Sequence, residues 1–346
     1  MEKSQAEHDL DELLAESLAD AARRAADQTP LGDGDALVLY GAGMLGRTVL
    51  AKLRRVGIEP AAFADDTPEK QGRMVEGVEV LTPREIVARF GDGVLFVVTI
   101  MNQRLRFVEA RRRLQSAGAA RVVSFVNLAW KYPETFLPHY LFELPQQVLT
   151  KATDIRRAFH AFEDEESRRQ FVAHLKFRLQ LDYDALPESS RDDYFPPDLV
   201  PGLPDDGVFV DCGAYDGDTV RRFLERQRGR FGRIYAFEPD ALNCERLRAY
   251  VATLGEECAR RIHVYHAGVG DRRAKINFNA TGDMSASFGG AGGLEVDVLP
   301  LEEVVESDDT RATIYLKYDV EGAERDALKG AQGLIERVRP ILAISV

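Results

Sequence analysis

Cysteine is scarce in this chain, and long apolar runs are missing from it. The three cysteines, Cys212, Cys244 and Cys258, show no Cys-x-x-Cys spacing, and their odd number leaves one without a disulfide partner. This usage favours reduced thiols, as in a cytoplasm. No run of about 18 apolar residues is present, and acidic residues open the N-terminus where a secretory signal would carry basic ones. We therefore expect a soluble cytoplasmic protein without a membrane span.

Basic residues are outnumbered as well. Lys and Arg total 45 against 57 Asp and Glu, which gives a formal net charge of -12 at pH 7. A chain of this sign is poorly suited to neutralise phosphates, so we expect no nucleic-acid partner. Its 346 residues, 45% of them hydrophobic and 29% charged, are typical of a soluble protein with about two domains.

The stretch Val208 to Asp218, VFVDCGAYDGD, is the most informative part of the chain. An apolar strand ends at Asp211, Gly213 and Gly217 follow, and a helical pattern begins at Thr219. Strand, glycine turn and helix present backbone N–H groups to a ligand at the carboxyl edge of a parallel sheet. The spacing lacks one glycine of the dinucleotide fingerprint and adds an acid, which suits the cationic sulfonium of S-adenosylmethionine better than a pyrophosphate.

A second acid supports this interpretation. The apolar stretch Arg233 to Phe237 ends in Glu238, which lies about 21 residues after Gly217, near the spacing of a ribose-binding acid. The alternative is an ordinary strand–helix–strand unit with an exposed acid.

A glycine-rich turn also occurs near the N-terminus. Gly41, Gly43 and Gly46 follow an apolar strand, and Asp65 comes about 19 residues later, where an acid would bind a ribose. Further strand and helix patterns up to residue 126 predict a parallel sheet. The glycines could hold a nucleotide or nucleotide-sugar, or they could serve only tight strand–helix packing.

The third chemical stretch is Ile314 to Glu324, IYLKYDVEGAE. A buried strand is followed by Lys317, Asp319, Glu321 and Glu324, which we expect at the carboxyl edge of a sheet. Such a group suits a general base for a hydroxyl, or a divalent metal bound by Asp319, Glu321 and Glu324. The alternative is a helix start, where acids are favoured by the helix dipole.

We expect four regions along the chain. They are a lead helix over 1–30, a Rossmann-like nucleotide-binding-type domain over 31–128, a helical and proline-rich connector over 129–204, and a domain over 205–346 that carries the motifs suited to S-adenosylmethionine. Within the connector, Tyr194 and Phe195 could cover the cofactor pocket or only a core edge.

The motifs together resemble the FkbM family of S-adenosylmethionine-dependent methyltransferases. The matching stretches are VFVDCGAYDGDT (208–219), YAFEPD (235–240), HAGVGD (266–271), SASF (285–288) and LKYDVEGAERDALKGA (316–331). The resemblance implies an α/β class I methyltransferase fold and O-methylation of a sugar, glycan or other natural product. It also implies a set of cofactor-binding residues, namely Asp211, Gly213, Ala214, Gly217, Asp218, Thr219, Glu238, His266, Ala267 and Ser285.

By the same resemblance, Lys317, Asp319 and Glu321 would face the methyl group. The first domain resembles nucleotide-binding domains on sugar-modifying enzymes, which suggests polysaccharide biosynthesis and a nucleotide or nucleotide-sugar at Gly41, Gly43, Gly46 and Asp65. A different class of function is a nucleotide-sugar-binding or scaffold protein whose methyltransferase domain is not catalytic. Either type could form a homo-oligomer.

A class I methyltransferase sheet has seven strands, and residues 340–346 look like the fifth. We therefore expect a methyltransferase domain truncated after strand five, or one whose sheet closes by other means.

Overall fold

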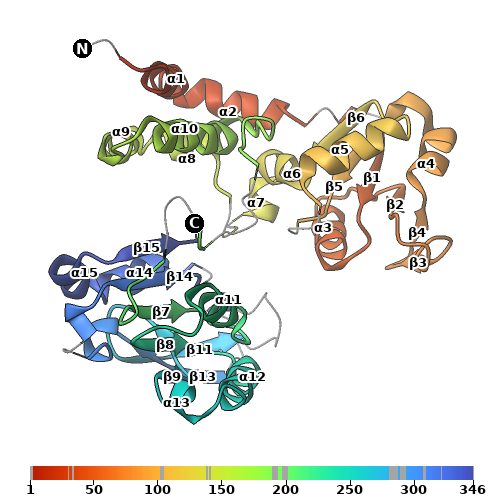
Figure 1. The fold of residues 1–346 in the computed structure, drawn as a ribbon. Coiled ribbons are helices and arrows are strands. Elements are labelled where there is room, and N and C mark those ends of the chain that lie inside the picture. The colour runs from red at the N-terminus through yellow and green to blue at the C-terminus, as the bar shows by residue number, and fades with distance from the viewer. Residues whose placement is uncertain are drawn as a thin grey trace. The chain divides into compact units, whose positions relative to one another are not determined.

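The chain divides into two units, Met1–Glu188 (unit 1) and Ser189–Val346 (unit 2), and each is described by itself (Figure 1). The computed structural model describes residues 3–29, 31–32, 35–101, 105–137, 139, 142–188, 194–196, 202–279, 287–288, 294–306, 309–320 and 322–345.

Unit 1 contains a parallel sheet that an antiparallel edge strand extends. In the described residues its order is β3-β4-β2-β1-β5-β6, and only β3 runs antiparallel, against β4. The strands are β1 (Ala36–Tyr40), β2 (Ala62–Ala64), β3 (Met74–Val75), β4 (Val78–Leu81), β5 (Val94–Val98) and β6 (Arg121–Ser124). The helices after them are α3 (Met44–Arg55), α4 (Pro83–Phe90), the short η1 (Gly91–Gly93), α5 (Phe107–Ser116), α6 (Phe125–Lys131) and α7 (Pro133–Phe136). Central strands such as β5 are buried along their whole length, which explains their unbroken apolar sequence.

The other helices of unit 1 share a core of their own. They are α1 (Gln5–Leu14), α2 (Leu18–Asp27), α8 (Pro145–Leu149), α9 (Ala152–Ala161) and α10 (Glu165–Gln180). The expected lead helix is two helices, because Ser17 caps the second by accepting a hydrogen bond from the Asp20 N–H. Leu10 of α1 and Leu175 of α10 lie in one apolar cluster. The helical part of the expected connector therefore packs with the chain's first helices (Figure 1).

Unit 2 is built on a parallel sheet with the order β15-β14-β7-β8-β9. Its strands are β7 (Val208–Cys212), β8 (Arg233–Phe237), β9 (Ile262–Tyr265), β14 (Ile314–Tyr318) and β15 (Ile341–Ile344). The helices are α11 (Asp218–Gln227), α12 (Ala241–Ala252), α13 (Glu256–Ala259), α14 (Glu324–Lys329) and α15 (Gln332–Val338). Apolar clusters lie on both faces of the sheet, with Phe209 in one and Val210 in the other.

A smaller mixed sheet is inserted between β9 and β14. Its order is β10-β13-β11-β12, with β10 (Gly268–Val269), β11 (Ala274–Asn279), β12 (Ser287–Phe288) and β13 (Leu294–Leu299). Strands β11 and β13 pair antiparallel. Two short 3-10 helices follow, η2 (Leu301–Glu303) and η3 (Asp309–Arg311).

The two parallel sheets have the same topology. Numbered along the chain, the parallel strands of each follow the order 3-2-1-4-5, which confirms the expected α/β class with two parallel-sheet units. The order reverses between β1 and β5 in unit 1 and between β7 and β14 in unit 2. Ligands of such sheets bind at the carboxyl ends of the strands beside this switch point. No helix in the described part of the chain is both long and apolar enough to cross a bilayer.

Candidate functional site

The glycine turn of unit 2 lies at the switch point, tightly against the end of β14. Gly213 has a φ of +87°, and a Cβ there would lie 1.9 Å from the carbonyl oxygen of Asp319. Gly217 has a φ of +90° and precedes α11, where a Cβ would lie 2.7 Å from Leu247 Cδ1. Both positions need glycine for the backbone angle and for the space, so the predicted glycine turn has a physical cause.

The backbone of this turn is held by β8. The N–H groups of Gly213 and Ala214 donate to the Phe237 carbonyl at 3.0 and 2.9 Å. The Tyr215 N–H donates to Glu238 Oε2 at 2.8 Å. The glycine turn and the acid that the sequence placed beside it are therefore in direct contact.

Glu238 is a buried carboxylate held only by backbone groups among the described residues. Its side chain is 6% exposed, and Oε1 accepts from the Asp240 N–H at 2.8 Å. Burial raises the pKa of Glu238 to about 7, although the N–H groups of Asp240 and Tyr215 oppose that shift. Each carboxylate oxygen can accept a second hydrogen bond, which is the capacity that two ribose hydroxyls require.

Lys317 and Asp211 form an ion pair inside the site. Nζ donates to Asp211 Oδ1 at 2.9 Å and to the Gly213 carbonyl at 2.7 Å, and the two side chains are 2% and 0% exposed. Burial raises the pKa of Asp211 to about 6, and the neighbouring Lys317 ammonium opposes that shift. By the resemblance Lys317 would face the methyl group; in the structure its ammonium contacts Asp211 and Gly213, because β14 and β7 pair Lys317 beside Asp211.

Asp319 is the more accessible carboxylate at the end of β14. It is partly exposed, and Oδ2 accepts from the Tyr194 hydroxyl at 2.7 Å. Phe195, only 2% exposed, packs 5.5 Å from Tyr315 between ring centroids and so anchors this segment. From the sequence, Tyr194 and Phe195 could cover either the cofactor pocket or a core edge; in the structure Tyr194 contacts Asp319 and Phe195 lies in the core.

Glu324, another acid of the third stretch, is held by backbone groups at the start of α14. Glu324 Oε1 accepts from the N–H groups of Val320 and Gly322 at 3.1 and 3.3 Å, as expected of a helix start. Glu321 lies outside the described residues. Within the part of the chain that is described, no three His, Cys, Asp or Glu side chains converge as metal ligands would.

The other expected cofactor positions in the described residues lie at the start of α11 and directly after β9. Asp218 begins α11 and accepts from the Thr219 N–H at 2.8 Å, while Thr219 itself is buried. His266 is exposed and donates from Nε2 to the Pro239 carbonyl at 3.1 Å. His266 and Ala267 line an open groove of about 570 Å³ that β11 and β13 border. Ser285 lies outside the described residues.

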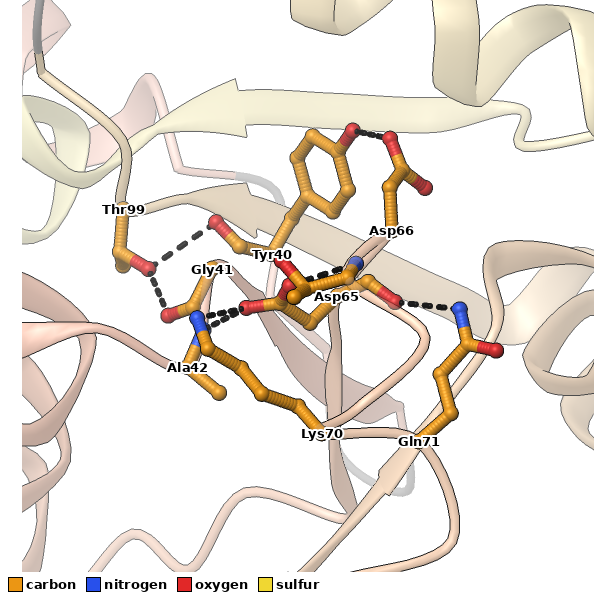
Figure 2. A network of polar contacts seen from close by, with 9 residues as sticks. Tyr40, Gly41, Ala42, Asp65, Asp66, Lys70, Gln71 and Thr99 are labelled. Carbon is orange, nitrogen blue, oxygen red and sulfur yellow. Dashed lines mark hydrogen bonds and ion pairs between the residues drawn. The ribbon is translucent and has the colours of Figure 1, made fainter.

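In unit 1 the corresponding acid, Asp65, accepts hydrogen bonds from three protein groups. Asp65 is 6% exposed, and Oδ2 accepts from the Ala42 N–H at 2.8 Å and from Lys70 Nζ at 2.9 Å. Oδ1 accepts from the Thr67 N–H at 2.9 Å. Burial would raise the pKa of Asp65, but the hydrogen bonds from Thr67, Lys70 and Ala42 lower it overall. Figure 2 shows this network beside the glycine turn.

The glycines of unit 1 differ in what surrounds them. A Cβ at Gly46 would lie 1.9 Å from the Gly41 carbonyl oxygen, so this glycine lets α3 pack against the turn. Gly41 has a φ of +115° and is tied by its carbonyl to the Thr99 hydroxyl at 2.9 Å (Figure 2). Gly43 has no atom within 4 Å of its Cβ position and precedes α3 without a side-chain cap.

The strand order of unit 2, its glycine turn and the acid after the second strand define a doubly wound, Rossmann-like fold. Residues 211–346 match the methyltransferase FkbM domain family, so unit 2 carries a domain of that family.

Two further comparisons concern the whole chain. The crystal structure of a methyltransferase FkbM from Methylobacillus flagellatus KT superposes with a TM-score of 0.76 at 20% sequence identity. The match covers 99% of this chain and 88% of that one, so the fold of both units occurs together in another protein. No curated protein matches this chain by sequence.

Proposed function

We propose that this protein is an S-adenosylmethionine-dependent O-methyltransferase acting on a hydroxyl of a sugar, glycan or other natural product. The observation that carries the proposal is the contact between the glycine turn and Glu238 at the switch point of unit 2. The FkbM domain match over residues 211–346 supports the same ligand class.

The residues present suit this cofactor. S-adenosylmethionine supplies an electrophilic methyl group on a sulfonium, together with a ribose and an amino-acid part. Glu238 offers two acceptor oxygens for the ribose hydroxyls, and the Tyr215 N–H ties it directly to the glycine turn. His266 and Ala267 border the same edge beyond Glu238, and we place them with the turn in the cofactor site.

Asp319 is the proposed base. It lies at the carboxyl end of β14, is partly exposed, and is oriented by the Tyr194 hydroxyl. Its carboxylate would take the proton that an acceptor hydroxyl loses as its oxygen gains the methyl group. Most of the rate would come from holding the two reactants in line.

The proposed proton transfer to Asp319 does not require a metal ion. Asp319 Oδ2 accepts from the Tyr194 hydroxyl, and Glu324 Oε1 accepts from the Val320 N–H. One oxygen of each carboxylate is therefore already engaged by a protein group. A divalent cation at these residues and Glu321 was one expectation from the sequence, and the proposal proceeds without it.

A sugar or glycan acceptor is the narrower part of the proposal. It rests on the glycine turn of unit 1, where Gly43 leaves open space at the start of α3. We propose a nucleotide or nucleotide-sugar there, a role in polysaccharide biosynthesis, and a cytoplasmic location. Oδ2 of Asp65 already accepts from Lys70 and the Ala42 N–H, so a ribose hydroxyl would compete with Lys70 there or bind at Oδ1. A thermal-shift screen of the full chain against nucleotides and nucleotide-sugars tests this, and a flat screen contradicts it.

Methyl transfer from S-adenosylmethionine labelled on the methyl group, to a panel of sugars and glycans, tests the proposed function. Asp319→Asn should abolish transfer and leave cofactor binding intact. Asp326→Asn is the matched control, because Asp326 is exposed and pairs with Lys329 in α14. If the cofactor does not bind saturably, the alternative of a non-catalytic binding or scaffold protein replaces this proposal.

A further inference from the structure

Lys317 is the buried charge that the proposed chemistry does not use. Its side chain is only 2% exposed, and removing an ammonium from water is costly unless partners compensate. The groups that contact the Lys317 ammonium should therefore show what this lysine does.

Three groups surround the ammonium. Nζ lies 2.9 Å from Asp211 Oδ1 and 2.7 Å from the Gly213 carbonyl oxygen. On a further side, the Tyr194 ring centroid lies 5.0 Å from Nζ. Lys317 thereby connects β14 to both the end of β7 and the glycine turn that follows it.

The contact with Gly213 fixes a peptide plane. One peptide unit carries the Gly213 carbonyl, which accepts from Lys317, and the Ala214 N–H, which donates to the Phe237 carbonyl at 2.9 Å. This unit is therefore held from β14 at one end and from β8 at the other. Gly213 has a φ of +87°, and a glycine without such anchors populates many conformations.

The orientation of that peptide plane also affects Glu238, the proposed ribose-binding residue. The next N–H along the chain, that of Tyr215, donates to Glu238 Oε2 at 2.8 Å. A turn that loses its anchor at Gly213 would also lose the fixed direction of this N–H.

We propose that Lys317 is a positioning residue of the cofactor site, which orients the Gly213–Ala214 peptide and so preforms the turn and Glu238 for the ligand. Its neutralisation of Asp211 is a second and separable effect. The identity of the ligand rests on the proposed function, whereas the order of the turn is a property of the protein alone.

The test uses the full chain and two measurements. Amide hydrogen exchange over residues 211–219 without ligand reports the order of the turn, and calorimetry with S-adenosylhomocysteine reports binding. The variants are Lys317→Met and the double variant Asp211→Asn/Lys317→Met. Lys329→Met is the control, because Lys329 is exposed and pairs only with Asp326 among the described ion pairs.

Lys317→Met should melt at a lower temperature, because Asp211 stays buried without a cation. The double variant should recover much of that loss, since both charges are gone. Its turn amides should still exchange roughly tenfold faster than those of the wild type, and the ligand should bind roughly tenfold more weakly, because the Gly213 carbonyl has lost its donor. Lys329→Met should match the wild type in both measurements.

Wild-type exchange in the turn of the double variant would overturn the proposal and leave Lys317 as a counter-ion for Asp211. If Lys317→Met does not fold, the double variant decides the question. If the wild type binds no S-adenosylhomocysteine, the proposed function fails, but the exchange comparison still decides the role of Lys317.

Discussion

In both units a strand ends in a glycine turn at the switch point, and an acid follows the neighbouring strand. In unit 1 that acid, Asp65, accepts from two backbone N–H groups and from the Lys70 ammonium. In unit 2 the acid, Glu238, accepts from two backbone N–H groups and is paired with no cation in the described residues. The pKa of Asp65 is accordingly lowered, while burial raises that of Glu238 to about 7.

The two units therefore share the backbone arrangement around the glycine turn, but the carboxylates of Asp65 and Glu238 have different partners. Asp65 is stabilised by its own protein, so a ligand hydroxyl would compete with Lys70 for it. Glu238 is buried without a compensating charge, and hydrogen bonds from a ligand would relieve part of that cost. This contrast is why we place the cofactor in unit 2 and regard unit 1 as the less prepared site.

Gly213→Ala should strongly destabilise unit 2. The new Cβ would meet the Asp319 carbonyl oxygen, and a φ of +87° strains any residue other than glycine. We expect a loss of about 3 kcal/mol or more in the free energy of unfolding, measured by urea denaturation. Gly43→Ala in unit 1 is the matched change and should cost less than about 1 kcal/mol, because its Cβ enters open space. Equal losses would contradict the different packing of the two turns.

Each glycine turn has a lysine beside it, and removing that lysine tests the ion pair that it forms. Lys317→Met should cost about 3–5 kcal/mol, because it leaves Asp211 buried and unpaired. Lys70→Met should cost no more than about 1 kcal/mol, since Lys70 is 38% exposed and water screens its pair with Asp65. Thermal or urea unfolding of both variants checks the order, and a larger loss for Lys70→Met would reverse it.

The two acids should also differ in their pH dependence. A carboxyl whose pKa in the folded chain exceeds its ordinary 4.5 binds a proton more tightly when folded, so stability is lost as the pH rises from 4.5 to about 7. We expect Glu238 to remove about 1–3 kcal/mol from unit 2 across that window, and Glu238→Gln to reduce the loss. Asp211, with a pKa raised to about 6, would account for the part that remains.

Unit 1 provides the internal control for this measurement. The lowered pKa of Asp65 confines its pH dependence to values below its ordinary 3.8, where stability is lost as the pH falls. The single tryptophan, Trp130, is buried in unit 1, so its fluorescence follows that unit during urea unfolding. Between pH 4.5 and 7 the titration of Asp65 should not move the fluorescence transition; a shift there belongs to groups such as His139 and His174, whose pKa values burial lowers. A loss in unit 2 that Glu238→Gln leaves unchanged would contradict the assignment to Glu238.

Chelation should have the smallest effect. Glu324 supports the loop before α14 through two backbone N–H groups, and Asp319 binds the Tyr194 hydroxyl. Cofactor affinity and methyl transfer should therefore be unchanged after dialysis against EDTA. If activity is lost with the chelator and restored by a divalent cation, the interpretation of the acidic stretch as a metal site would be supported instead.

The sequence predicted the backbone of both sites because short-range signals determine it. Unbroken apolar runs mark the buried strands, and Gly213 and Gly217 mark a turn whose angles only glycine adopts freely. The spacing to Glu238 was informative because one helix and one strand of ordinary length separate it from the turn.

The partners of the charged side chains were harder to predict. Lys317 and Asp319 lie two residues apart, yet one is buried against Asp211 and the other meets Tyr194 from a distant part of the chain. Such pairings depend on strand register and tertiary packing, which local patterns do not encode. The same holds for Lys70, whose contact with Asp65 makes the two glycine turns different.

Calorimetric titration of the full chain with S-adenosylhomocysteine tests the central claim most directly when Glu238→Gln and Asp65→Asn are compared with the wild type. The account predicts saturable binding to the wild type, a loss of about 1.5–3 kcal/mol in binding free energy for Glu238→Gln, and no change for Asp65→Asn. Wild-type affinity in a folded Glu238→Gln variant, or a larger loss in Asp65→Asn, would contradict the placement of the cofactor in unit 2.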